Sequence, residues 1–244
     1  MSEEKGVNTM AVTVDIKALL EAGVHFGHKT SRWHPKMAPY IHSKRQENHI
    51  IDLTKTVEGL NAALPVVTET VAKGKQVLLV GTKRQAKDLV KKTAEEVGQP
   101  YVSERWLGGT LTNAATIGGQ IKHLKNLQRR MDSGELENRY NKLEVQRFQE
   151  EIDDLKLKYG GIQDLNGKPG VVFVTDVISD ANAVREANKL NIPVVAIVDT
   201  NADPENIDYV IPGNDDAIKS IQLILDYVKQ AINEGAAKKK EEAK

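Results

Sequence analysis

Acidic side chains follow two apolar runs at the points where those runs end. Asp176 follows VVFVT (171–175), Asp199 follows PVVAIV (193–198), and Asp203 lies in the same loop as Asp199. If both runs are parallel strands, these carboxylates meet at one sheet edge, where a divalent cation would relieve their repulsion. His28 would complete a mixed nitrogen and oxygen site for zinc or magnesium if its loop folds over that edge. Helix capping and loop hydrogen bonding by the aspartates is the simpler alternative.

A second kind of chemistry is indicated by the basic window 25–49. It holds five Lys or Arg residues against the single acid Glu47, together with five of the six histidines of the chain. Such cations neutralise phosphates, and interleaved aromatic rings can stack on unpaired bases. We expect Phe26 and Tyr40 to fill the core instead. The residues of this window predicted to contact RNA are Lys29, Arg32, Trp33, His34, Lys36, Lys44 and Arg45.

Further basic side chains follow at three places. Two of them come one residue after VLLVG (77–81), where parallel sheets bind anions at helix N-termini. One precedes Trp106, which we expect to be a packing anchor. Four more recur at helical spacing in 122–130, where an ordinary solvated face is an equally good explanation. These candidates for RNA contact are Lys83, Arg84, Arg105, Lys122, Lys125, Arg129 and Arg130.

Composition excludes several classes of protein. The chain has 244 residues, no net charge and no cysteine, so disulfides and thiolate chemistry are excluded. The neutral average hides an asymmetry, because 176–216 holds nine acids against two cations. We expect that acidic part to face away from RNA and to dock a protein neighbour. No apolar run approaches the roughly 20 residues of a membrane span, and no leader pattern occurs, so we expect a cytoplasmic protein without membrane contact.

Enzyme motifs are missing where the fold would place them. TKRQAKD follows VLLVG in place of a glycine-rich phosphate loop, and neither a G-x-S-x-G nor an H-E-x-x-H motif occurs. The sequence therefore predicts no catalysis, no organic cofactor and no small-molecule substrate. A rival hypothesis is an enzyme or ligand sensor in which Lys83 and Asp199 line a pocket at the sheet edge.

Short apolar runs alternate with helical patterns, which predicts an α/β protein with about five parallel strands. The expected arrangement is doubly wound and flavodoxin-like. Before it we expect a helix near 13–22, two short strands in 39–53 and a helix near 54–73. The predicted parts are a disordered extension (1–10), one globular domain (11–110 with 160–232), an insertion (111–159) and a charged flexible tail (233–244).

The insertion is too long for a simple crossover. Ala114, Ile117, Ile121 and Leu124 recur at a spacing of three or four, and a second apolar series runs from Val145 to Tyr159. Two such helices should pair as an antiparallel coiled-coil hairpin that reaches a partner. An alternative is an adaptor whose coiled coil binds protein alone.

Several segments resemble one known family. They are AGVHFGHKTSRWHPKMAPYI, HIIDLTKT, VLLVGTKRQA, RWLGGTLTN, IPVVAIVDTNADP and DYVIPGNDDAI, spread over about 22–232. All are similar to the bacterial small-subunit ribosomal protein two family. The resemblance implies a structural role in translation, with binding to 16S rRNA between the head and the body of the small subunit. It also implies contact with other small-subunit proteins, including ribosomal protein one. The resemblance further implies a metal pocket at His28, Asp176, Asp199 and Asp203.

Overall fold

A computed structural model of the chain describes residues 13–242. Its centre is a five-stranded parallel sheet in the spatial order β5-β4-β6-β7-β8. Counted along the chain, this is the order 2-1-3-4-5 that is typical of flavodoxin-like folds. The predicted α/β, doubly wound fold is therefore confirmed. The five strands are β4 (Val77–Val80), β5 (Tyr101–Val102), β6 (Val171–Val174), β7 (Val194–Val198) and β8 (Tyr209–Pro212).

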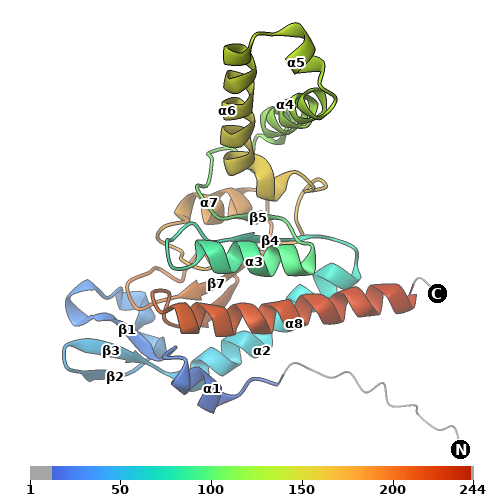
Figure 1. Ribbon diagram of the computed structural model, residues 1–244. Helices are drawn as coiled ribbons and strands as arrows, with labels where there is room; N and C mark the ends of the chain where they lie inside the picture. The colour runs from blue at the N-terminus through green and yellow to red at the C-terminus, as the bar shows by residue number, and fades with distance from the viewer. Residues whose placement is uncertain (1–12, 243–244) are drawn as a thin grey trace, which may run out of the picture.

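Alternate side chains of each central strand enter two different cores, because successive residues of a strand point to opposite faces. Leu79 and Phe173 pack into the first core with α2, α3 and α8, whereas Leu78 and Val172 pack into the second with α7 and the start of α4 (Figure 1). The sheet is thus covered on both sides, which explains why its strands are apolar throughout. The helices against it are α2 (Leu53–Ala72), α3 (Lys87–Val97), α7 (Ala181–Lys189) and α8 (Ile218–Glu242).

A small antiparallel sheet, in the order β1-β3-β2, follows the short helix α1 (Ile16–Glu21). The two strands expected in 39–53 are present as β2 (Ile41–Arg45) and β3 (Asn48–Ile51). The third, β1 (Phe26–Lys29), was not predicted, because its sequence FGHK shows no alternation of apolar and polar residues. Tyr40 packs against the second core as expected, but the prediction for Phe26 was wrong, since its side chain is 52% exposed.

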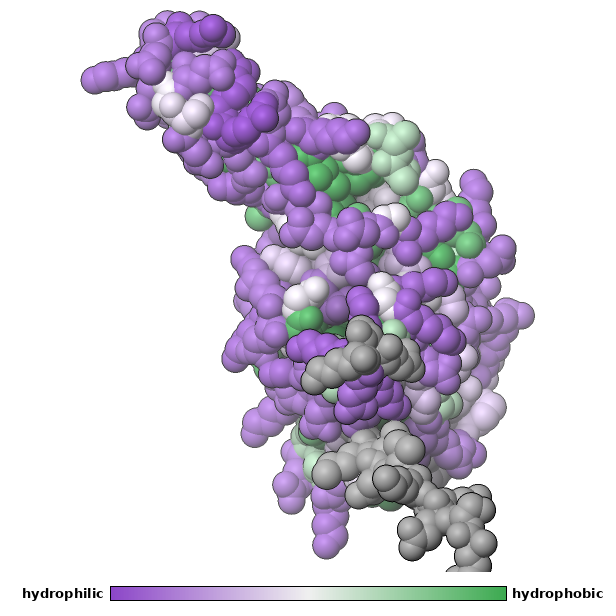
Figure 2. All heavy atoms as spheres, turned by 90° about the vertical axis from the view of Figure 1, so that its right-hand side faces the viewer, coloured by the Kyte–Doolittle hydropathy of each residue, from purple (hydrophilic) through white to green (hydrophobic). Residues whose placement is uncertain are grey.

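The insertion folds as α4 (Ala114–Asp132), the short α5 (Glu135–Arg139) and α6 (Lys142–Tyr159). The two long helices stand off the globular body (Figure 1) and pack through a core of their own, formed by Leu124, Leu127, Ile152 and Leu155. The two helices were predicted; a coiled-coil supercoil between them stays a prediction. Apolar surface gathers near the junction of hairpin and body, whereas most of the rest of that face is polar (Figure 2).

The last helix, α8, runs past the boundary expected at 233 and ends at Glu242. It packs along α2, and a Cβ built on Gly235 would lie 2.4 Å from the carbonyl oxygen of Thr68. The start of the expected flexible tail is thus part of a packed helix, while the expected extension 1–10 lies outside the described residues. Within 13–242, none of the helices combines the length and the apolar character that crossing a bilayer requires.

Candidate functional site

The small N-terminal sheet lies against the carboxyl edge of the central sheet. The amide of His28 donates to the Thr200 hydroxyl at 2.9 Å, and the amide of His34 donates to the Thr200 carbonyl at 2.7 Å. A Cβ on Gly27 would meet the Thr200 side chain at 2.6 Å, so only glycine permits this approach. Because Thr200 lies two residues after the end of β7, the basic N-terminal segment is held at the edge where doubly wound folds bind ligands.

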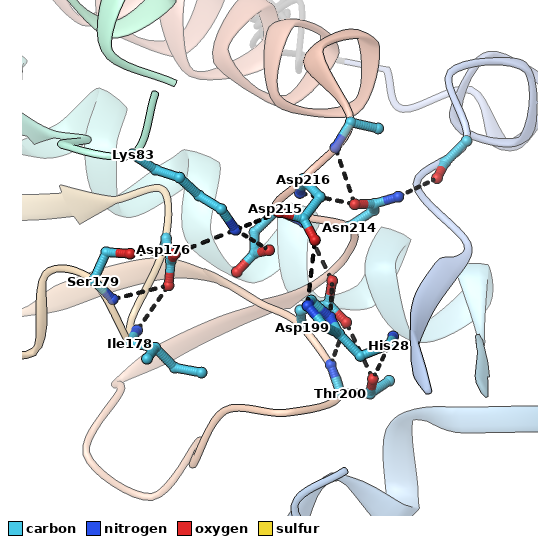
Figure 3. Close-up of polar contacts among 12 residues, drawn as sticks. His28, Lys83, Asp176, Ile178, Ser179, Asp199, Thr200, Asn214, Asp215 and Asp216 are labelled. Atoms are coloured by element: carbon cyan, nitrogen blue, oxygen red, sulfur yellow. Dashed lines mark hydrogen bonds and ion pairs between the residues drawn. The ribbon is translucent and has the colours of Figure 1, made fainter. Parts of the chain in front are cut away.

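Six charged side chains meet at this edge and form what we call the acidic cluster (Figure 3). The imidazole of His28 lies between two carboxylates, with Nδ1 3.1 Å from Asp199 and Nε2 3.2 Å from Asp216. The Lys83 ammonium is 2.8 Å from Asp215, 2.7 Å from Asp216 and 3.3 Å from Asp176. The cluster consists of His28, Lys83, Asp176, Asp199, Asp215 and Asp216.

Negative charge outweighs positive charge in the acidic cluster, and the titration of its members reflects this. The hydrogen bond with Asp199 raises the pKa of His28 more than burial lowers it. Burial, reinforced by Asp176 and Asp199, raises the pKa of Asp215 to about 7 even though Lys83 opposes the shift. Burial would lower the pKa of Lys83, but its bonds to Asp215 and Asp216 outweigh burial and raise the pKa. A further cation would therefore be bound favourably here.

The donor set for such a cation differs from the predicted one. Within 13–242, ligand atoms of His28, Asp199 and Asp215 all lie within 4.8 Å of one another, and they form the one group of this kind. Asp176 instead accepts hydrogen bonds from the amides of Ile178 and Ser179 and from the Ser179 hydroxyl. It thus takes part in the loop hydrogen bonding that is the simpler alternative to metal binding. One imidazole nitrogen and two carboxylates fit zinc or magnesium, and the imidazole favours zinc.

Asp203 is engaged elsewhere at the edge of the sheet. Its carboxylate lies 3.1 Å from the Lys36 ammonium and 3.9 Å from the His34 ring, and Glu205 also pairs with Lys36. It is therefore not among the residues that the structure brings to His28.

Some of the cations predicted to contact RNA are taken by carboxylates of the chain itself. Lys83 is the clearest case, because its side chain is only 18% exposed and makes three ion pairs. Within the chain Lys83 holds the acidic cluster together, and its contact with RNA stays a prediction. Lys36 pairs with Asp203 and Glu205, Lys125 with Asp164, and Arg130 with Glu135.

The remaining predicted cations are exposed, and no ion pair to them is found in the described part of the chain. Arg84 and Arg105 follow the neighbouring parallel strands β4 and β5 and so share the carboxyl edge. Lys29 and Arg32 are brought to the same edge by the contacts of His28 and His34. Beside them the Trp33 ring, 38% exposed, lies against the buried His49 ring. The complete set is Lys29, Arg32, Lys44, Arg45, Arg84, Arg105, Lys122 and Arg129, of which Arg129 also donates to Asn126.

Comparison of the sequence with known proteins shows the family to which the chain belongs. The family model "Ribosomal protein S2" matches residues 19–235. The chain belongs to the ribosomal protein S2 family. The small ribosomal subunit protein uS2 of Roseiflexus sp. (strain RS-1) is 50% identical over 222 residues, which is 91% of this chain and 84% of the relative. The proteins of the same name from Rickettsia rickettsii and Chloroflexus aggregans are 49% and 48% identical, over 91% and 93% of this chain and 76% and 95% of their own lengths.

Membership of the S2 family establishes a structural, non-catalytic role in the small ribosomal subunit. It also makes the ribosome the cellular location, a cytoplasmic particle in these bacterial relatives. The rival hypothesis of an enzyme using Lys83 and Asp199 is thereby excluded.

Two acidic residues of this S2-family site were missed in the ligand prediction. Asp215 and Asp216 follow β8 in the segment YVIPGNDD, one strand beyond Asp199. The strand-end rule that selected Asp176 and Asp199 selects them as well. They were overlooked because YVIP is short and because two residues, Gly213 and Asn214, separate the strand from the acids.

Proposed function

We propose that this S2-family chain binds 16S rRNA between the head and the body of the small subunit, through the unpaired cations at the carboxyl edge of its sheet. The observation that supports the proposal is that the carboxylates at that edge are paired within the chain, whereas several of the cations are not. Carboxylates there are bound internally by Lys83, His28 and Lys36, whereas Lys29, Arg32 and Arg84 remain exposed. The internal pairs neutralise part of the negative charge that would otherwise repel phosphates.

Phosphate contacts from such cations position a protein on RNA and make its affinity depend on salt. Lys44 and Arg45 extend the basic surface along β2, and Lys122 extends it onto the hairpin. The exposed Trp33 adds an aromatic face on which an unpaired base can stack. The adaptor hypothesis, with protein contacts alone, does not explain why these cations are left without partners.

Docking of ribosomal protein one is the second part of the proposal. Many of the acids that were expected to form the docking surface are engaged within the chain, so acidic charge alone is a weak attraction. Exposed apolar side chains are a better indication of a protein-binding surface than acidic charge is, because burying them against a partner is favourable. Near α1, Ile16, Leu20 and Phe26 are 47%, 53% and 52% exposed. We propose this apolar edge as the protein-facing part.

The third part of the proposal is a bound divalent cation, zinc in preference to magnesium, held by His28, Asp199 and Asp215. A cation there would neutralise a cluster that joins the N-terminal sheet to the ends of β7 and β8. Its contribution would be structural, because it would fix the basic segment from which Lys29 and Arg32 project.

Cosedimentation of the purified chain with small subunits lacking it tests the main proposal. We expect stoichiometric binding at low salt that declines steeply as KCl rises, and no comparable binding to large subunits. Equal sedimentation with both subunits would contradict specific assembly.

A further inference from the structure

A small notch of about 70 Å³ lies where the hairpin meets the globular body. Its walls come from three segments that are far apart in sequence: α3, the loop after β5, and the last turn of α6. Its floor is tightly built, because a Cβ on Gly161 would lie 2.2 Å from the carbonyl oxygen of Tyr101. The polar and charged residues that line it include Lys91, Ser103, Glu104, Arg105, Lys156 and Lys158.

Charge in this notch is mostly positive and mostly unsatisfied. Glu104 is shared with Lys87 at 3.4 Å, and Lys158 is paired with Asp154 at 2.5 Å. Lys91, Arg105 and Lys156 are exposed and have no ion pair within 13–242. Three like charges from three segments repel one another, and the negative end of the α6 dipole offsets them only in part. An anion in the notch would remove that repulsion.

The size of the notch narrows the choice of anion. Pockets for free small-molecule ligands have volumes of about 300–1,000 Å³, far above this one. A single phosphate group that belongs to a polymer needs no larger pocket, because the rest of the polymer is bound elsewhere. Arginine and lysine are the side chains that bind phosphate oxygens best.

We propose that Lys91, Arg105 and Lys156 bind one phosphodiester of the rRNA backbone and thereby lock the hairpin to the body. The inference rests on the proposed rRNA binding and adds a site to it, because neither Lys91 nor Lys156 belongs to the predicted RNA-contacting set. One phosphate held by α3, the β5 loop and α6 fixes the angle at which the hairpin leaves the body. The hairpin is then aligned by RNA as well as by its own core.

The test compares two variants of equal charge. K91Q/K156Q removes two notch cations, and K92Q/K142Q removes two exposed lysines from the same two helices outside the notch. Affinity for 16S rRNA is measured against KCl concentration. We expect the slope of log affinity against log salt to fall by about one for the notch variant and to stay at the wild-type value for the control. Equal slopes for the two variants would contradict the proposed phosphate contact in the notch, while the proposal of rRNA binding would still stand.

A distance measurement supplies an independent readout. The chain has no cysteine, so N138C on α5 and K189C on α7 place one spin label on the hairpin and one on the body. rRNA should narrow the distance distribution in the wild-type background and in the control, but not in K91Q/K156Q. Narrowing in all three would overturn the locking role. If the wild-type protein does not prefer 16S rRNA over unrelated RNA, the proposed rRNA binding is contradicted. The proposed phosphate contact in the notch is then contradicted as well, because it rests on that binding.

Discussion

The indole nitrogen of Trp106 donates a hydrogen bond to the Glu186 carboxylate, with 3.0 Å between nitrogen and oxygen. This bond joins α7 to the loop that leads into the hairpin. The same carboxylate accepts from the amides of Gly109, Leu111 and Thr112 and from the Thr112 hydroxyl. One half-buried side chain therefore organises RWLGGTLTN (105–113), in which Arg105 is exposed and after which α4 begins.

Replacing Glu186 with glutamine should destabilise the fold. The amide keeps one acceptor oxygen and introduces a donor among donors, so several amides of the loop lose their partner. We expect a loss of about 1–3 kcal/mol in the free energy of unfolding. Urea unfolding followed by tryptophan fluorescence measures it, with E137Q on exposed α5 as the matched control. An unchanged urea midpoint for E186Q would contradict this role.

The contribution of Glu186 should also depend on pH. Burial would raise the pKa of this carboxyl, but the hydrogen bonds from Trp106, Leu111, Gly109 and Thr112 outweigh burial and lower the pKa below its ordinary value of 4.5. A lowered pKa in the folded state means that the stabilisation is present above pH 4.5 and is lost as pH falls through the folded-state pKa. The difference in unfolding free energy between wild type and E186Q should therefore shrink in acid. A difference that stays constant down to pH 3 would contradict the assignment.

Lys83 and Arg84 are neighbours in sequence, but we expect their substitution to affect different properties, stability for Lys83 and rRNA affinity for Arg84. K83M leaves Asp176 and Asp215 without the lysine and Asp216 with His28 alone. We expect a loss of roughly 3 kcal/mol in stability, reduced to the extent that water reaches the site. R84Q should leave stability unchanged and weaken rRNA binding, because its side chain is exposed and unpaired. Denaturant midpoints and RNA affinities of both variants measure the contrast. The same pattern in both variants would show that the two residues do not differ in role.

A divalent cation in the acidic cluster should stabilise the chain. At a concentration 100 times the dissociation constant, binding contributes about 2.7 kcal/mol, which corresponds to a rise of roughly 5–10 °C in Tm. We expect this rise with Zn²⁺, a smaller one with Mg²⁺, and none for D215N. D203N is the informative control, because the carboxylate of Asp203 lies with Lys36 rather than with His28. Loss of the effect in D203N, or its survival in D215N, would contradict the ligand set.

The central sheet could be predicted because a doubly covered strand must be apolar along its whole length. VLLV, VVFV and VVAIV satisfy that condition, and the helices between them have helical periodicity. The position of Asp199 at the sheet edge followed from the same reasoning. β1 could not be predicted, because FGHK lacks a strand pattern and, besides its pairing with β3, His28 is held by Thr200, 172 residues further along the chain.

Charge pairing was the least predictable part of the site. A count of charges in the surrounding sequence does not distinguish Lys83 from Arg84. In the structure, however, Lys83 is half-buried among aspartates and Arg84 is exposed. Which of two adjacent cations turns inward depends on the positions of Asp215 and Asp216, 132 and more residues away. Sequence spacing cannot supply that information. The role of Glu186 was hidden for the same reason, since its partners lie 74 to 80 residues earlier in the chain.

The salt dependence of rRNA binding tests the central claim most directly, when cations at the two edges of the sheet are compared. K29Q/R32Q/R84Q removes three cations from the carboxyl edge. K75Q/K168Q/K189Q removes three exposed lysines that precede β4, β6 and β7 and so lie toward the opposite edge. We predict that the first variant lowers the slope of log affinity against log salt by about two to three and that the second leaves it unchanged. Equal losses from both edges would contradict the account, because the chain would then bind RNA through its overall charge rather than through the carboxyl edge of its sheet.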